Sequence, residues 1–86
     1  MDLQPNKLTD HDGDRYAFTI GSDLTRDGMY LEVTAISDAA VAILEVFYSD
    51  TTNRLTVSLF REAVCAELLE QALSVARDRL LPKDPS

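Results

Sequence analysis

Four segments of the chain alternate between apolar and polar residues, which is the two-residue period of a β-strand with one buried face. Short polar connections rich in turn-forming residues separate these segments, and Asp27-Gly28 closes the first of the connections. The third segment has apolar residues on both sides. The pattern therefore predicts four strands, at Arg15–Gly21, Met29–Ile36, Val41–Tyr48 and Arg54–Phe60.

The period changes from two residues to 3.6 between about Glu62 and Leu80, which predicts a helix. Acidic residues lie in its first half and Arg77 and Arg79 near its end, an order that complements the helix dipole. Pro82 follows and would end the helix. One apolar stripe runs along the segment and consists of Cys65, Leu68, Leu69, Ala72, Leu73, Ala76 and Leu80.

Short connections favour antiparallel pairing of consecutive strands. We therefore predict an α+β fold, a four-stranded antiparallel β-meander with one C-terminal helix packed on one face (β-β-β-β-α). The 86 residues suffice for a single domain. We place that domain at residues 15–82, with a flexible N-terminal tail at 1–14 and a C-terminal tail at 83–86.

One helix covers one face of such a sheet, so the opposite face is predicted to be open. The strand pattern assigns Tyr16, Phe18, Ile20, Leu31, Val33, Leu44, Val46, Leu55, Val57 and Leu59 to the helix side. It assigns Ile36, Val41, Ile43, Phe47 and Phe60 to the open side, beside Tyr30, Glu32, Glu45 and Thr56. An apolar patch with an acidic and aromatic rim is typical of an interaction surface. Scattered surface residues or cover by the N-terminal tail would explain the same pattern.

Eight basic and fifteen acidic residues give a net charge of −7. This charge argues against nucleic acid and membrane surfaces as partners, because both attract positive patches. It is compatible with simple solubility and also with attraction to a basic protein partner. No apolar run approaches the ~20 residues of a membrane span. The chain starts without a signal-peptide pattern and has a single cysteine, so we expect a cytoplasmic protein.

The residues offer little for catalysis. His11, the one histidine, lies in the predicted tail, and Cys65 lies on the apolar stripe of the helix. The run Asp10–Asp14 resembles the start of a calcium loop but lacks the closing Glu. We therefore expect no catalytic residue, no cofactor and no metal, and a protein that is not an enzyme.

Three stretches together resemble small bacterial immunity proteins encoded beside polymorphic toxins of the Rhs and contact-dependent inhibition kinds. They are Arg26–Glu32, Glu45–Asp50 and Ala76–Pro82, and with the segments between them the resemblance spans residues 16–82. The resemblance implies a cytoplasmic antitoxin that binds and blocks the toxin domain of a larger effector. Such domains often have basic clefts, so the implied partner is a basic toxin domain.

The resemblance transfers no functional residues, so the partner-binding residues are predicted from the pattern alone. On the open face they are Tyr30, Glu32, Glu45 and Phe47, and in the loops they are Asp23, Arg26, Asp27 and Asp50, with Tyr48 nearby. Tyr48 is also compatible with a core position on the helix side. The alternative function is a small acidic adaptor that forms a homodimer through the open face.

Overall fold

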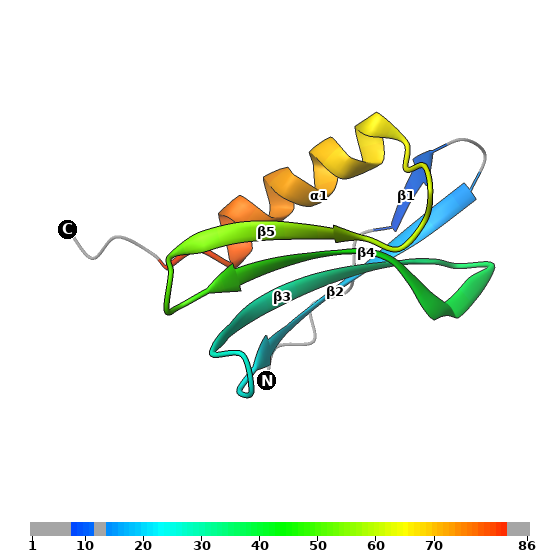
Figure 1. The fold of residues 1–86 in the computed structure, drawn as a ribbon. Coiled ribbons are helices and arrows are strands. Elements are labelled where there is room, and N and C mark those ends of the chain that lie inside the picture. Colours follow the sequence, from blue (N-terminus) through cyan, green and yellow to red (C-terminus); the bar gives the residue numbers. More distant parts are fainter. Residues whose placement is uncertain (1–7, 12–13, 83–86) are drawn as a thin grey trace.

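The computed structural model describes residues 8–11 and 14–82, and shows one sheet with a helix across it (Figure 1). The strands are antiparallel and follow the order β1-β2-β3-β4-β5. The predicted α+β meander with a C-terminal helix is therefore confirmed. The elements are β1 (Leu8–His11), β2 (Asp14–Asp23), β3 (Gly28–Ala35), β4 (Asp38–Ser49), β5 (Arg54–Leu59) and α1 (Ala66–Arg79).

The sheet has one strand more than the four predicted. This strand, β1, lies within the segment that was predicted as a tail, and pairs with β2 from Leu8 opposite Ala17 to His11 opposite Asp14. Its four residues show no apolar alternation, so the pattern gives no strand signal there. Asp14, the last residue of the predicted N-terminal tail, begins β2. The remaining residues of the two predicted tails, 1–7, 12–13 and 83–86, lie outside the described residues.

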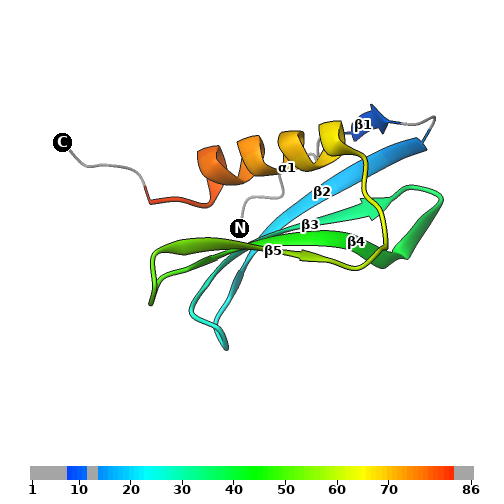
Figure 2. The same cartoon turned by 45° about the horizontal axis from the view of Figure 1, so that its top comes forward.

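The helix α1 packs on one face of the sheet, where it contacts β1, β3 and β4. It buries Leu68, Ala72 and Ala76, whose four-residue spacing places them on one side of a helix. The two alanines allow the helix backbone to approach the sheet closely. The helix begins at Ala66, later than the predicted Glu62, because residues 60–65 carry the chain from the end of β5 across to the helix (Figure 2).

The strand register aligns the core residues across β2, β3 and β4. Phe18 lies opposite Val33, and Val33 lies opposite Leu44. The predicted helix side is thus correct for these three strands. It is only partly correct for β5, because Val57 and Leu59 remain 39% and 50% exposed although they share that face. One helix is about 10–12 Å across, whereas five strands at ~4.8 Å spacing span about twice that width.

A β-bulge corrects the prediction for Ile43. Val33 pairs with Leu44 and Thr34 pairs with Ala42, so Ile43 has no partner on β3. A bulge re-aims the side chain of its extra residue. Ile43 therefore joins the core and is 1% exposed, instead of lying on the open face.

Candidate protein-binding face

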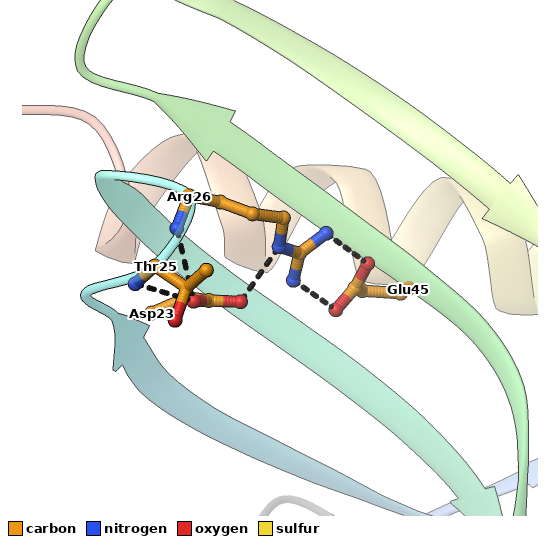
Figure 3. Close-up of polar contacts among 4 residues, drawn as sticks. All are labelled: Asp23, Thr25, Arg26 and Glu45. Atoms are coloured by element: carbon orange, nitrogen blue, oxygen red, sulfur yellow. Dashed lines mark hydrogen bonds and ion pairs between the residues drawn. The ribbon is translucent and has the colours of Figure 1, made fainter.

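The sheet face opposite α1, called the outer face below, holds a charged cluster centred on Arg26. The Arg26 Nε atom donates to Asp23 Oδ2 at 2.6 Å, and its Nη1 and Nη2 atoms donate to the two carboxylate oxygens of Glu45 at 3.1 and 2.9 Å (Figure 3). A planar guanidinium that binds one carboxylate through two parallel hydrogen bonds is held in a defined orientation. The side chain therefore lies back across the sheet from the β2–β3 loop to β4.

The β2–β3 loop is shaped to present Arg26. The Asp23 Oδ1 atom accepts hydrogen bonds from the backbone N–H groups of Thr25 and Arg26 at 3.0 and 3.1 Å, which is the local bonding that makes Asp a turn former. Asp27 completes the turn with a φ of 54°, a conformation that Asp tolerates better than most residues. Asp23 thus orders the loop backbone and the Arg26 side chain together.

Phe47 forms the apolar part of the same cluster. The Arg26 guanidinium carbon lies 4.1 Å from the centroid of the Phe47 ring, within the range of a cation–π contact. The ring also packs against Gly28, where an added Cβ atom would come within 2.5 Å of it. Phe47 is consequently only 9% exposed, although its strand position faces away from the helix. Asp23, Arg26, Glu45 and Phe47 are called the Arg26 cluster below.

The ion pairs shift two titrating groups of the Arg26 cluster. The side-chain hydrogen bond from Arg26, followed by the one from its backbone N–H, lowers the pKa of the Asp23 carboxyl below its ordinary value. The hydrogen bonds with Glu45 and then Asp23 raise the pKa of the Arg26 guanidinium. One guanidinium between two carboxylates leaves the Arg26 cluster with a formal charge of −1. The cation is therefore neutralised within the protein.

Glu32 adds a third carboxylate, next to the two of the Arg26 cluster. It lies directly opposite Glu45 in the β3–β4 register, as expected from the sequence. Its side chain is partly buried, and among the described residues it has no ion-pair partner. Like charges on directly opposed residues destabilise a sheet. Arg26 offsets this repulsion from the Glu45 side only, so Glu32 remains available to a positive group from outside.

Tyr30 continues the outer face next to Phe47, its cross-strand neighbour. Its other neighbour is Gly21 on β2, and an added Cβ atom at Gly21 would lie 2.7 Å from the Tyr30 hydroxyl. The aromatic ring therefore extends over the glycine and follows the surface of the sheet. Tyr30, Phe47 and Arg26 form one continuous strip across β2, β3 and β4.

The predicted loop residues lie at the same end of the sheet. The Asp50 backbone N–H donates to the carbonyl of Asp27 at 2.9 Å, which ties the β4–β5 loop to the β2–β3 loop. Both aspartates are exposed. With Asp23 they form the acidic rim that the meander topology predicts for this end.

Tyr48 lies apart from the other predicted residues. It is 4% exposed on the helix side, and its hydroxyl donates to Asn53 Oδ1 at 2.8 Å. Asn53 has a φ of 59°, so this bond supports the left-handed residue that closes the β4–β5 loop. Tyr48 therefore occupies the core position that the sequence also allowed.

Leu24 is a surface residue that the sequence reasoning missed. It is 87% exposed at the tip of the β2–β3 loop, next to Asp23. The sequence did contain a signal for its exposure, because a leucine inside an otherwise polar turn is not expected to reach the core.

Comparison with protein-family models, with curated proteins and with solved structures finds no match. Within residues 8–11 and 14–82, no helix combines the length and apolar character needed to cross a membrane. In the same part of the chain, no three His, Cys, Asp or Glu side chains gather in a way that could hold a metal ion.

Proposed function

We propose that the chain is a cytoplasmic immunity protein that binds a basic toxin domain through its outer face and blocks it by protein–protein contact. The observation that carries the proposal is the Arg26 cluster, which lies on the face that α1 leaves open (Figure 3). Arginine and aromatic residues at the centre of a surface, with carboxylates around them, are typical of specific protein interfaces.

The geometry of the Arg26 cluster favours tight binding. Ordering a long side chain at an interface costs roughly 0.5–1.5 kcal/mol. Arg26 is already held by three hydrogen bonds and a ring contact, so this ordering is complete before a partner arrives. A pre-ordered surface retains more of its contact energy as affinity.

The charge distribution favours a basic partner. Glu32 presents a carboxylate at the middle of the outer face, and Asp27 and Asp50 present two more at one end. The internal pairing of Arg26 with Asp23 and Glu45 offsets the positive charge of its guanidinium at this end. Long-range attraction between such a rim and a basic cleft raises the association rate more than the final affinity.

The same face is poorly suited to the alternative of a face-to-face homodimer. Ile43 lies in the core and Phe47 is covered by Arg26, so two apolar residues expected on the open face do not contribute to its surface. Two copies meeting there would also bring together two faces that each carry Glu32 and an Arg26 cluster with a formal charge of −1. The outer face therefore favours a partner of opposite charge.

The test begins with a pull-down by the tagged chain from its native cytoplasm, with elution in a salt gradient and identification by mass spectrometry. The captured domain is then expressed alone, and its affinity is measured for the wild type, Glu32→Lys and Glu70→Lys. Both variants reverse one charge, but Glu70 is exposed on α1. We expect Glu32→Lys to weaken binding at least about tenfold and Glu70→Lys to leave it nearly unchanged.

Two further readouts decide the proposal. Co-expression of the wild-type chain should relieve growth inhibition by the captured domain, and Glu32→Lys should relieve it less. Absence of any basic partner would overturn the proposal. Equal weakening by the two charge reversals would also overturn it, because overall charge and not the outer face would then govern binding.

A further inference from the structure

The strand β5 is the last strand of the sheet, and its outer edge has no strand beside it among the described residues. Figures 1 and 2 show β5 beside β4 as the last strand of the sheet. Its helix-side residues Val57 and Leu59 are 39% and 50% exposed, and the adjoining Phe60 is 56% exposed. An exposed apolar edge strand is a template for pairing with another chain.

The backbone direction shows which groups this edge offers. The Phe60 N–H donates to the carbonyl of Ile43 on β4 at 2.8 Å. Residues along an antiparallel strand alternate between facing the partner and facing away. Ser58, Thr56 and Arg54 therefore face β4, and the N–H and C=O groups of Leu55, Val57 and Leu59 point outward. The outward backbone groups belong to the three residues with apolar side chains.

Natural edge strands are usually protected by lysine, proline, a bulge or very short length. The segment Arg54–Leu59 has no lysine and no proline, and its pairing with β4 shows no register shift. The opposite edge differs, because β1 has only four residues and includes Asp10. Of the two edge strands, β5 is thus the one without these features that prevent pairing with another chain.

The sequence of β5 is complementary to itself. A two-fold axis through Val57 places Val57 opposite Val57 of a second copy, and Leu55 opposite Leu59. All three residues have outward backbone groups, so this register lets every one of them form hydrogen bonds. The same register places Arg54 opposite Phe60 on the outer face, an arrangement suited to a cation–π contact.

The distribution of acidic residues also favours self-association at the β5 edge. A net charge of −7 makes copies of this chain repel each other over most of their surface. The longest run without Asp or Glu is Thr51–Arg61, which contains all of β5. Two copies therefore meet here with no carboxylate on either strand.

We propose that two copies of the chain pair through their β5 edges, antiparallel and centred on Val57. The two five-stranded sheets then form one continuous sheet, with both helices on one side and both outer faces on the other. The axis runs perpendicular to the sheet, so the Arg26 clusters of the two copies stay open. The dimer does not depend on the proposed function, and it is tested on the chain alone.

The first experiment is sedimentation equilibrium of the wild type, Val57→Lys and Thr56→Lys over a range of concentrations. Both variants add one lysine to β5. In Val57→Lys the new ammonium group would face its own copy across the axis, whereas in Thr56→Lys it would face Ser58 on the other side of the sheet. We expect Val57→Lys to raise the dissociation constant at least about tenfold and Thr56→Lys to change it little.

Charge complementation then tests the centre of the register. Val57→Glu alone should be monomeric, and an equimolar mixture with Val57→Lys should form heterodimers whose affinity falls as salt is added. Failure of the mixture to associate, with both variants folded by circular dichroism, would overturn the proposed register.

Cysteine cross-linking gives an independent test, made in a Cys65→Ser background. Directly opposed Cα atoms lie about 4.5–5.5 Å apart in an antiparallel pair, within the range of a disulfide. Val57→Cys should therefore cross-link to itself on oxidation. Leu55→Cys should not, but it should cross-link when mixed with Leu59→Cys. A wild type that stays monomeric at about 100 µM, with no Val57→Cys cross-link, would overturn the dimer and leave the β5 edge to a strand from a different protein.

Discussion

Replacing Gly28 by alanine tests whether the packing beneath the Arg26 cluster is as tight as the structure shows. A Cβ atom at Gly28 would overlap the Tyr48 carbonyl oxygen and would lie 2.5 Å from the Phe47 ring. The first neighbour is backbone within the β4 ladder, so it cannot move without disturbing the pairing of β3 with β4. The second is a ring that the Arg26 guanidinium also contacts.

Gly21 provides a matched control on the same face. There the added Cβ atom would meet the Tyr30 hydroxyl at 2.7 Å. That hydroxyl is the far end of an aromatic side chain, which can rotate away over the sheet surface. The two substitutions add the same methyl group to neighbouring strands, and differ in whether the neighbour can move.

We expect Gly28→Ala to lower the free energy of unfolding by about 2–3 kcal/mol, the upper part of the range for overpacking. Gly21→Ala should change it by less than about 1 kcal/mol, because reduced freedom of the unfolded chain offsets part of the strain. For a domain of this size, the Gly28→Ala loss corresponds to a fall in Tm of roughly 10–20 °C.

The measurement is urea denaturation followed by circular dichroism, with thermal unfolding as a second probe. Equal m-values for the wild type and both variants would show that the change lies in stability. Equal losses for the two glycines would refute the reasoning, because local packing at Gly28 would then have no special role.

Three further predictions concern single interactions. Tyr48→Phe removes the hydrogen bond to Asn53 and should lower the free energy of unfolding by about 1 kcal/mol in urea denaturation; an unchanged stability would contradict a role for this bond. The pKa of Asp23, measured by NMR titration, should lie below its ordinary value and return toward it in Arg26→Met. Because the folded-state pKa is the lower one, the contribution of this pair to stability is present above the unfolded-state pKa and is lost as pH falls through the folded-state value. Ala72→Leu should destabilise the protein by about 1–3 kcal/mol, because Ala72 is fully buried where α1 approaches the sheet; a neutral change would show that the interface can open.

The proposed dimer has a consequence for the outer face. Pairing through β5 places two Arg26 clusters on the same side of one sheet, and doubles the binding surface without covering it. A bivalent protein of this kind binds a paired target more tightly than its single sites would, through effective concentration. Val57→Lys should therefore weaken binding to a dimeric target while leaving binding to a monomeric one unchanged.

Periodicity along the sequence determined the meander, the helix and most of the core. The two-residue alternation at Phe18, Val33 and Leu44 requires one buried face, and the later change of period requires a helix to cover it. The turn residues Asp27 and Asn53 take up the positive φ values that their loops need. These features follow from the sequence because each depends on residues close together along the chain.

Tertiary structure alone decided the features on which the two proposals rest. The bonds between Arg26 and Glu45 join residues that are 19 positions apart, so no local pattern encodes them. The bulge at Ile43 arises from the pairing of β3 with β4, and β1 forms only because β2 offers it an edge. The exposure of Val57 and Leu59 on the helix side of β5 follows from width, because one helix cannot cover five strands. Periodicity indicates the face of the sheet on which a residue lies. Which side chains contact each other, and which are buried, depends on how the strands and the helix pack in three dimensions.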